Sequence, residues 1–178
     1  MHRLFVAIRP PAPIRTRLLD VMGGVPGARW QTEDQLHLTL RFIGEVDAHV
    51  ADDVAAALLG VTQPPFEIAL AGAGHFGRGG RSGALWIGVS PHDAVAALHK
   101  KIEGACRRAG LPSEGRAYLP HITVARLGRT AGPLDPFLSL ASATASEPFT
   151  VDHFSLYEST LGSEGATYEV VERYRLRA

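Results

Sequence analysis

The strongest constraint on the fold is that the two halves of the chain repeat the same order of secondary-structure elements. An apolar run typical of a buried strand, an amphipathic helix and a strand with a histidine appear once in each half. The two histidines, His37 and His121, are 84 residues apart. This period is too long for a solenoid. The simplest architecture is therefore a duplicated α+β unit with two antiparallel sheets facing each other.

Hydrophobic periodicity and turn residues place these elements. The segment 35–42 alternates, with Leu36, Leu38, Leu40 and Phe42 on one face and His37, Thr39 and Arg41 on the other. The expected strands are 4–8, 35–42, 66–70, 84–89, 119–125, 149–157 and 167–174. The first expected helix follows the prolines at 10, 11 and 13 and ends at Gly23-Gly24, and the other two span 47–59 and 93–109. The stretch 71–83 is expected to be a glycine-rich loop, and 133–140 is ambiguous.

Composition and charge exclude several classes of protein. With 178 residues, 46% of them hydrophobic, the chain can bury a core as a single domain, 1–178, made of two duplicated lobes. Cys106 is the only cysteine, which excludes a disulfide scaffold and fits a reducing, cytoplasmic location. The net charge is zero, so non-specific coating of a phosphate backbone is not expected. We expect no membrane-spanning or targeting segment and no obligate protein partner.

The repeat carries two similar tetrapeptides, His37-Leu38-Thr39-Leu40 and His121-Ile122-Thr123-Val124. In each, a histidine and a threonine two residues apart lie on one face of a strand. A pseudo-two-fold relation between the halves would bring these two faces together in one cleft. The alternative interpretation is two ordinary strand histidines, but two matching copies favour a functional pair.

Two imidazoles suit acid–base chemistry at a phosphate ester. A neutral imidazole accepts a proton from the nucleophile, and a protonated one donates to the leaving oxygen. Two threonine hydroxyls can bind the non-bridging oxygens, where negative charge builds up. No metal is required, because a zinc site needs three or four ligands and neither motif has a carboxylate or thiolate on its histidine face. We also expect no cofactor.

The segment Gly72–Gly77 matches G-x-G-x-x-G, but a dinucleotide fingerprint would have to open a helix. We instead expect a loop at the rim of the cleft, where Phe76, Arg78 and Arg81 could touch a nucleotide. A base could stack on Phe76 or Tyr118, although either ring could equally belong to the core.

The paired tetrapeptides resemble the signature of the 2H phosphoesterase superfamily, and within it the RNA 2′,3′-cyclic phosphodiesterases, also called 2′-5′ RNA ligases. This resemblance covers nearly the whole chain, and it includes Arg3–Ile8, Leu36–Gly44, the Gly72-x-Gly74-x-Phe76 segment before Leu85-Trp86, Pro120–Arg126, Leu156–Ser159 and Tyr168.

The resemblance implies a LigT-like α+β fold with two pseudo-symmetric lobes, each with an antiparallel sheet and helices, and an active-site cleft between the lobes. It implies hydrolysis of a terminal 2′,3′-cyclic phosphate of RNA to a 2′-phosphomonoester. The partners would be RNA ends or nucleotides that carry this group. Any ligase activity would be the reverse of a transesterification.

Carried over by position, His37 and His121 are the catalytic pair, and Thr39 and Thr123 bind the phosphate. We expect His121 to activate water and His37 to protonate the departing 3′ oxygen. Arg126 is a phosphate contact if its strand ends or twists, because strict alternation would place it on the Ile122 face.

Two further possibilities remain open. Arg41 is a second candidate for substrate contact, although a solvated edge arginine is as good an interpretation. The protein could also hold a nucleotide or an RNA end without turnover, or act on a small cyclic nucleotide or a cyclic phosphate of ADP-ribose.

Overall fold

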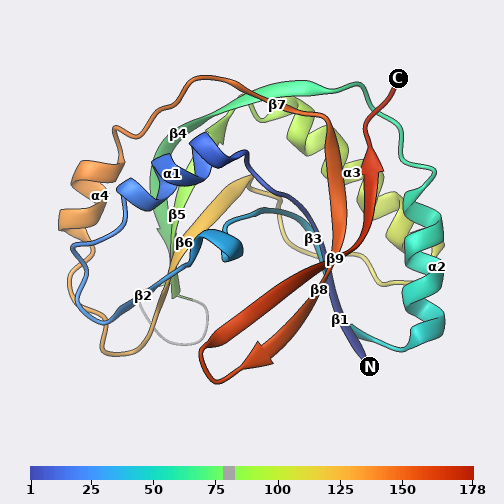
Figure 1. Ribbon diagram of the computed structural model, residues 1–178, viewed down its shortest axis with the longest axis horizontal. Coiled ribbons are helices and arrows are strands. Elements are labelled where there is room, and N and C mark those ends of the chain that lie inside the picture. Colours follow the sequence, from blue (N-terminus) through green and yellow to red (C-terminus); the bar gives the residue numbers. More distant parts are fainter. Residues whose placement is uncertain (78–82) are drawn as a thin grey trace.

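The computed structural model describes residues 1–77 and 83–178 and shows an α+β fold (Figure 1). The strands of this part form one antiparallel path in the order β7-β4-β5-β6-β3-β1-β8-β9, and β2 pairs with β6. The strands are β1 (His2–Ile8), β2 (Ala28–Trp30), β3 (Leu38–Val46), β4 (Phe66–Phe76), β5 (Gly83–Ser90), β6 (His121–Leu127), β7 (Phe149–Val151), β8 (His153–Gly162) and β9 (Gly165–Arg175); the helices are α1 (Ala12–Asp20), the 3₁₀ turn η1 (Glu33–Gln35), α2 (Ala48–Leu58), α3 (Asp93–Arg108) and α4 (Asp135–Ala141).

The path has two lobes that meet at a single paired position. One lobe consists of β3, β1, β8 and β9, and the other consists of β6, β5, β4 and β7. Between β3 and β6, the one pair of Cα partners is Leu38 and Ile122, the residues that follow the two motif histidines. The junction of the lobes therefore lies at the two motifs.

The lobes do not coincide with the two halves of the sequence. Strand β4 comes from the first half but pairs with β5, whereas β8 comes from the second half but pairs with β1. The single strand predicted over 149–157 is wrong, because the chain breaks at Asp152 into β7, which pairs with β4, and β8. Since each lobe contains strands from both halves, we infer that the chain folds as one domain.

Helix α3 packs on the sheet through an apolar stripe. The fully buried residues of α3 are Val95, Leu98, Ile102, Ala105 and Cys106, so Cys106 is a core residue. Helix α2 begins at an N-cap, where the Asp47 carboxylate accepts a hydrogen bond from the Val50 amide at 2.9 Å. No helix in the described ranges is both long and apolar enough to cross a membrane.

A β-bulge in β3 interrupts the alternation that the sequence shows. Thr39 is opposite Ala7 and Arg41 is opposite the preceding residue, Val6, so Leu40 is the extra residue of a bulge. The bulge turns Arg41 to the buried side, where it is 6% exposed, and turns Phe42 outward, where it is 45% exposed. The prediction that Phe42 shares the apolar face of Leu38 and Leu40 is therefore wrong.

Strand β6 has an equivalent bulge. Thr123 is opposite Trp86 and Ala125 is opposite the preceding residue, Leu85, so Val124 is the extra residue. This bulge turns Arg126 to the face of His121 and Thr123, which strict alternation would not allow. Arg126 and Phe42 each follow a motif histidine by five residues.

The glycine-rich stretch predicted as a loop over 71–83 is a strand as far as Phe76. Glycine is needed at position 74, because a Cβ there would overlap the Trp86 ring across the β4–β5 pair. In the described part of this segment, the residues from Gly72 to Phe76 are strand and not the start of a helix, which agrees with the rejection of a dinucleotide fingerprint. Arg78 and Arg81, predicted as nucleotide contacts, lie outside the described residues.

Candidate active site

The antiparallel register at the junction of the lobes places the two motifs side by side. On either side of the Leu38–Ile122 pair, His37 is the position opposite Thr123. By the same register, Thr39 is the position opposite His121. All four side chains point away from the face of Leu38 and Ile122, which are fully buried. The structure thus brings the four predicted residues to one face of one junction.

Each histidine is oriented by a hydrogen bond to its own backbone. Nδ1 of His37 lies 2.7 Å from the carbonyl oxygen of Gln35, and Nδ1 of His121 lies 2.7 Å from that of Leu119. Because a carbonyl only accepts, Nδ1–H must be the donor in both cases. The other ring nitrogen, Nε2, then carries no proton in the neutral imidazole and can accept one from a ligand or water.

Aromatic rings surround both imidazoles in a similar way. His37 makes an edge contact with Tyr168 at 5.2 Å and a tilted contact with Phe5 at 4.8 Å. His121 makes an edge contact with Phe76 at 4.9 Å, and the Trp86 ring lies 6.1 Å from it. These rings exclude water from part of each imidazole surface and limit its rotation.

The burial of both histidines lowers their pKa. The pKa of His37 is lowered to about 4, mainly by burial and to a smaller extent by the charges of Arg126 and His121, against the hydrogen bond to the Gln35 carbonyl, which raises it. For His121 the pKa is also lowered, by burial and by the Arg126 charge. The effect of His121 on His37 shows that the two imidazoles are close enough to interact. Both are neutral at pH 7 in the ligand-free protein.

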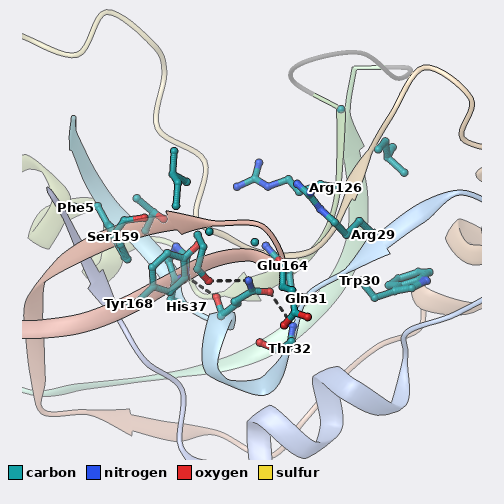
Figure 2. Close-up of a pocket in the computed structure, with 18 of the residues that line it drawn as sticks. Phe5, Arg29, Trp30, Gln31, Thr32, His37, Arg126, Ser159, Glu164 and Tyr168 are labelled. Carbon is teal, nitrogen blue, oxygen red and sulfur yellow. Dashed lines mark hydrogen bonds between the residues drawn. The ribbon is translucent and has the colours of Figure 1, made fainter. Parts of the chain in front are cut away.

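A cleft of about 940 Å³ opens beside the first motif (Figure 2). His37, Thr39 and Arg126 line it, whereas His121 and Thr123 are not among its lining residues. Other lining residues come from β1, β2, the segment before β3, β3 itself and the β8–β9 hairpin: Arg3, Phe5, Arg29, Gln31, Thr32, Gln35, Phe42, Ser159, Glu164 and Tyr168. In the described part of the chain, no three His, Cys, Asp or Glu side chains cluster as a metal site would require.

The sequence candidates outside the four motif residues divide into two groups. Arg126 lines the cleft, and its charge acts on both histidines. Phe76 lies against His121 and is 37% exposed, so its ring remains accessible to a ligand. Arg41 and Tyr118 lie on the other side of β3, among residues that support the site from behind.

The prediction that Arg41 contacts substrate is wrong. The guanidinium Nε lies 2.8 Å from Oε2 of Glu103, and Nη2 donates to the carbonyl oxygen of Pro112 at 2.6 Å. A weaker ion pair, at 3.7 Å, joins Nη1 to Glu114. The physical reason is the bulge at Leu40, which places Arg41 on the buried side of the sheet, against the carboxylates of Glu103 and Glu114, instead of in the cleft.

The suggested stacking of a base on Tyr118 is also not supported. The ring of Tyr118 is already stacked on His99, with centroids 3.9 Å apart and planes within 5°. Its hydroxyl donates to the carbonyl oxygen of Thr39 at 2.9 Å, and Nδ1 of His99 donates to the carbonyl of Leu40 at 2.6 Å. Tyr118 thus connects the segment before His121 to the backbone of the first motif.

Three residues of the cleft were not predicted from the sequence. Phe42 is one, although its place in the repeat, equivalent to that of Arg126, was a usable signal. Gln35 is the second: its side chain donates to the carbonyl of Ala166 at 2.9 Å, so it ties the β8–β9 hairpin to the turn that orients His37. Arg29 is the third, and no local signal identifies it, because its position depends on the pairing of β2 with β6.

This is a two-lobed α+β protein with one histidine–threonine motif in each lobe, and comparison with known proteins gives its family. The sequence profile of the 2′-5′ RNA ligase superfamily matches residues 10–162. The chain therefore belongs to the 2′-5′ RNA ligase superfamily, and the LigT-like fold predicted from the sequence is confirmed.

Individual relatives agree with this assignment. The chain is 29% identical to the RNA 2′,3′-cyclic phosphodiesterase of Thermotoga maritima over 95% of this chain and 92% of that protein. It is 30% identical to the protein of that name from Geobacillus stearothermophilus over 88% of this chain, and it spans about half (50%) of that protein's length. The crystal structure of E. coli LigT complexed with 3′-AMP superimposes with a TM-score of 0.80 at 26% identity, covering 99% of each chain.

Proposed function

We propose that this protein hydrolyses a terminal 2′,3′-cyclic phosphate of RNA to a 2′-phosphomonoester without a metal ion. The observation that carries the proposal is the pair of imidazoles at the lobe junction, each with Nδ1 bound to a carbonyl and Nε2 free, beside two threonines. The names of the relatives and the 3′-AMP bound by E. coli LigT support the same substrate class.

In the proposed reaction, His121 Nε2 takes a proton from water while the water oxygen forms a bond to phosphorus. The P–O3′ bond breaks, and the 3′ oxygen takes a proton from Nε2 of His37. The hydroxyls of Thr39 and Thr123 and the guanidinium of Arg126 donate to the non-bridging oxygens and stabilise the charge that develops on them. The product keeps its phosphate on the 2′ oxygen.

The cleft also has groups that suit a nucleoside. Phe42 is exposed on the cleft face, with the Arg3 guanidinium 5.3 Å from its ring centroid. A flat aromatic surface beside a cation can stack a base without selecting its identity. This arrangement fits a protein that recognises an RNA end rather than an RNA sequence.

This proposal is tested with a short RNA that ends in a 2′,3′-cyclic phosphate, incubated with the protein in EDTA. Phosphorus NMR is expected to show the cyclic signal replaced by that of a 2′-phosphomonoester. Adding an RNA with a free 5′-hydroxyl tests for the reverse transesterification, which would give a 2′-5′ linkage. Binding of the cyclic RNA without any product would contradict the proposal and indicate a binding module instead.

The low pKa of His37 predicts that anion binding is linked to proton uptake. A phosphate anion beside His37 favours its charged form, so the pKa in the complex must rise above the free value of about 4. Because the complex then binds more protons than the free protein, affinity for the 2′-phosphate product should increase as the pH falls from 8 toward 5. Histidine NMR signals recorded during a pH titration, with and without product, measure both effects.

The same titration tests the assignment of roles. If His37 is the acid, its signal should show the larger rise in pKa on product binding. A rise confined to His121 would exchange the roles of the two residues. No rise at either residue would contradict the acid–base pair. His49, whose side chain is 87% exposed on α2, provides an internal control whose NMR signals should not respond to product.

A further inference from the structure

Two arginines lie opposite each other in the cleft. The proposed reaction needs only one of them to contact the reacting phosphate. In the antiparallel pairing of β2 with β6, Arg29 is directly opposite Arg126. Directly opposed residues point to the same face of a sheet, with Cβ atoms about 5 Å apart, and like charges in this arrangement are destabilising. Both arginines are exposed and both line the cleft.

No carboxylate neutralises this pair within residues 1–77 and 83–178. Arg9, Arg15 and Arg41 each form an ion pair there, whereas Arg29 and Arg126 form none. Glu164, at the turn of the β8–β9 hairpin, lines the same cleft but makes no ion pair with either arginine (Figure 2). The two positive charges are therefore free to bind an anion in the cleft.

The position of Arg29 is fixed by the core. The next residue, Trp30, points to the opposite face and packs against Phe137, with ring centroids 5.6 Å apart. The amide of Gln31 donates to the carbonyl of Val124 at 2.9 Å, which extends the contact of this segment with β6. Arg29 is thus presented by a strand anchored on both sides, and not by a free loop.

Of the two arginines, only Arg126 acts electrostatically on the histidines. The charge of Arg126 lowers the pKa of both His37 and His121, whereas Arg29 has no such effect on either. A phosphate that reacts between the histidines is therefore close enough to Arg126 to interact with its positive charge. A second anion, displaced toward β2, would meet Arg29 and share Arg126 with the first.

We propose that Arg29, together with Arg126, binds a second phosphate of the substrate: the phosphate on the 5′ oxygen of the terminal nucleotide. In RNA this group is the last internucleotide phosphodiester. The proposal rests on the proposed function, because it places the reacting cyclic phosphate at the two histidines. It specifies the substrate as a nucleotide with a 5′-phosphate, and it predicts discrimination against a cyclic mononucleotide that lacks one.

The test compares three ligands by equilibrium binding. They are adenosine 2′-phosphate, the dinucleotide ApA ending in a 2′-phosphate, and the same dinucleotide with a neutral methylphosphonate linkage. The methylphosphonate keeps the second nucleoside and removes only the charge of the linkage. The wild-type protein is expected to bind the charged dinucleotide about tenfold more tightly than the neutral one, as for one charge-assisted hydrogen bond.

Arg29→Ala should bring this ratio close to one, and Arg29→Lys, which keeps the charge, should retain part of it. Arg107→Ala is the matched control, because Arg107 is an exposed arginine at the far end of α3. The control should keep the wild-type ratio. Denaturation curves for each variant establish that it is folded, and adenosine 2′-phosphate reports whether the catalytic end of its cleft still binds.

Two further measurements distinguish a nucleotide ligand from an RNA ligand and test whether Arg29 acts through its charge. Adenosine 2′,5′-bisphosphate carries the same 5′-phosphate without a second nucleoside, so a gain equal to that of the dinucleotide would identify a nucleotide site rather than an RNA site. For the charged dinucleotide, Arg29→Ala should also lower the slope of log affinity against log salt by about 0.7.

Equal affinity of the wild-type protein for the charged and neutral dinucleotides would overturn this inference. So would a ratio that survives Arg29→Ala. Because binding needs no turnover, these outcomes are independent of the hydrolysis assay. A protein that hydrolyses the cyclic phosphate but shows no charge preference refutes only the second phosphate site.

Discussion

His37→Ala is expected to lower turnover of an RNA 2′,3′-cyclic phosphate by about 10² to 10⁴-fold, the usual contribution of one positioned acid or base. The substitution removes the Nε2 that the geometry leaves free, while the Gln35 carbonyl that accepted from Nδ1 can bond to water. His121→Ala should have a similar effect. The rate of product formation from a short cyclic-phosphate RNA measures both.

The two histidines should behave as a unit. Combining the two alanine substitutions is expected to cost little more than either alone, because one proton transfer without the other gives no complete reaction. His49→Ala, on the exposed face of α2, is the matched control and should keep wild-type turnover. Full activity of either single active-site variant, or a double variant whose loss is the product of the two, would contradict the proposed pair.

Arg41→Met is expected to lower the free energy of unfolding by about 3–5 kcal/mol, the cost of leaving one partner of a buried ion pair uncompensated. The change removes the 2.8 Å ion pair with Glu103 and the hydrogen bond to the Pro112 carbonyl, and methionine keeps most of the apolar volume. Urea denaturation measures the loss.

The double variant Arg41→Met/Glu103→Leu provides the control for this interpretation. Replacing both members of a buried pair by apolar residues should restore much of the stability, because no charge is then left unpaired in the interior. A loss of less than 1 kcal/mol for Arg41→Met would show that the guanidinium is well solvated. A double variant less stable than the single one would assign the loss to packing.

Much of the fold could be predicted from local patterns. The stripe at Val95, Leu98, Ile102 and Cys106 predicts α3 because each residue lies one turn from the next, and all four are fully buried. The two tetrapeptides predict the motif strands and their polar faces for a similar reason, since alternation over three or four residues needs no information from the rest of the chain.

The predictions of which side chains face the cleft failed where pairing with a neighbouring strand introduces a bulge. Alternation assigned Arg41 to the cleft and Phe42 to the core, and the bulge at Leu40 reverses both. The bulge exists because β1 and β3 pair with an extra residue on one side, and this register cannot be read from either strand alone. The equivalent bulge in β6 acts in the same sense and brings Arg126 to the cleft.

The sequence by itself therefore determined the elements, the core stripes and the two histidine–threonine motifs, because these depend on residues a few positions apart. Only the tertiary structure decided which side of β3 faces the cleft, that β4 and β8 are exchanged between the lobes, and that Arg29 stands opposite Arg126. These features depend on hydrogen-bond pairing between strands distant in sequence. Such pairing is selected by the packing of the whole chain and leaves no periodic signal in any one segment.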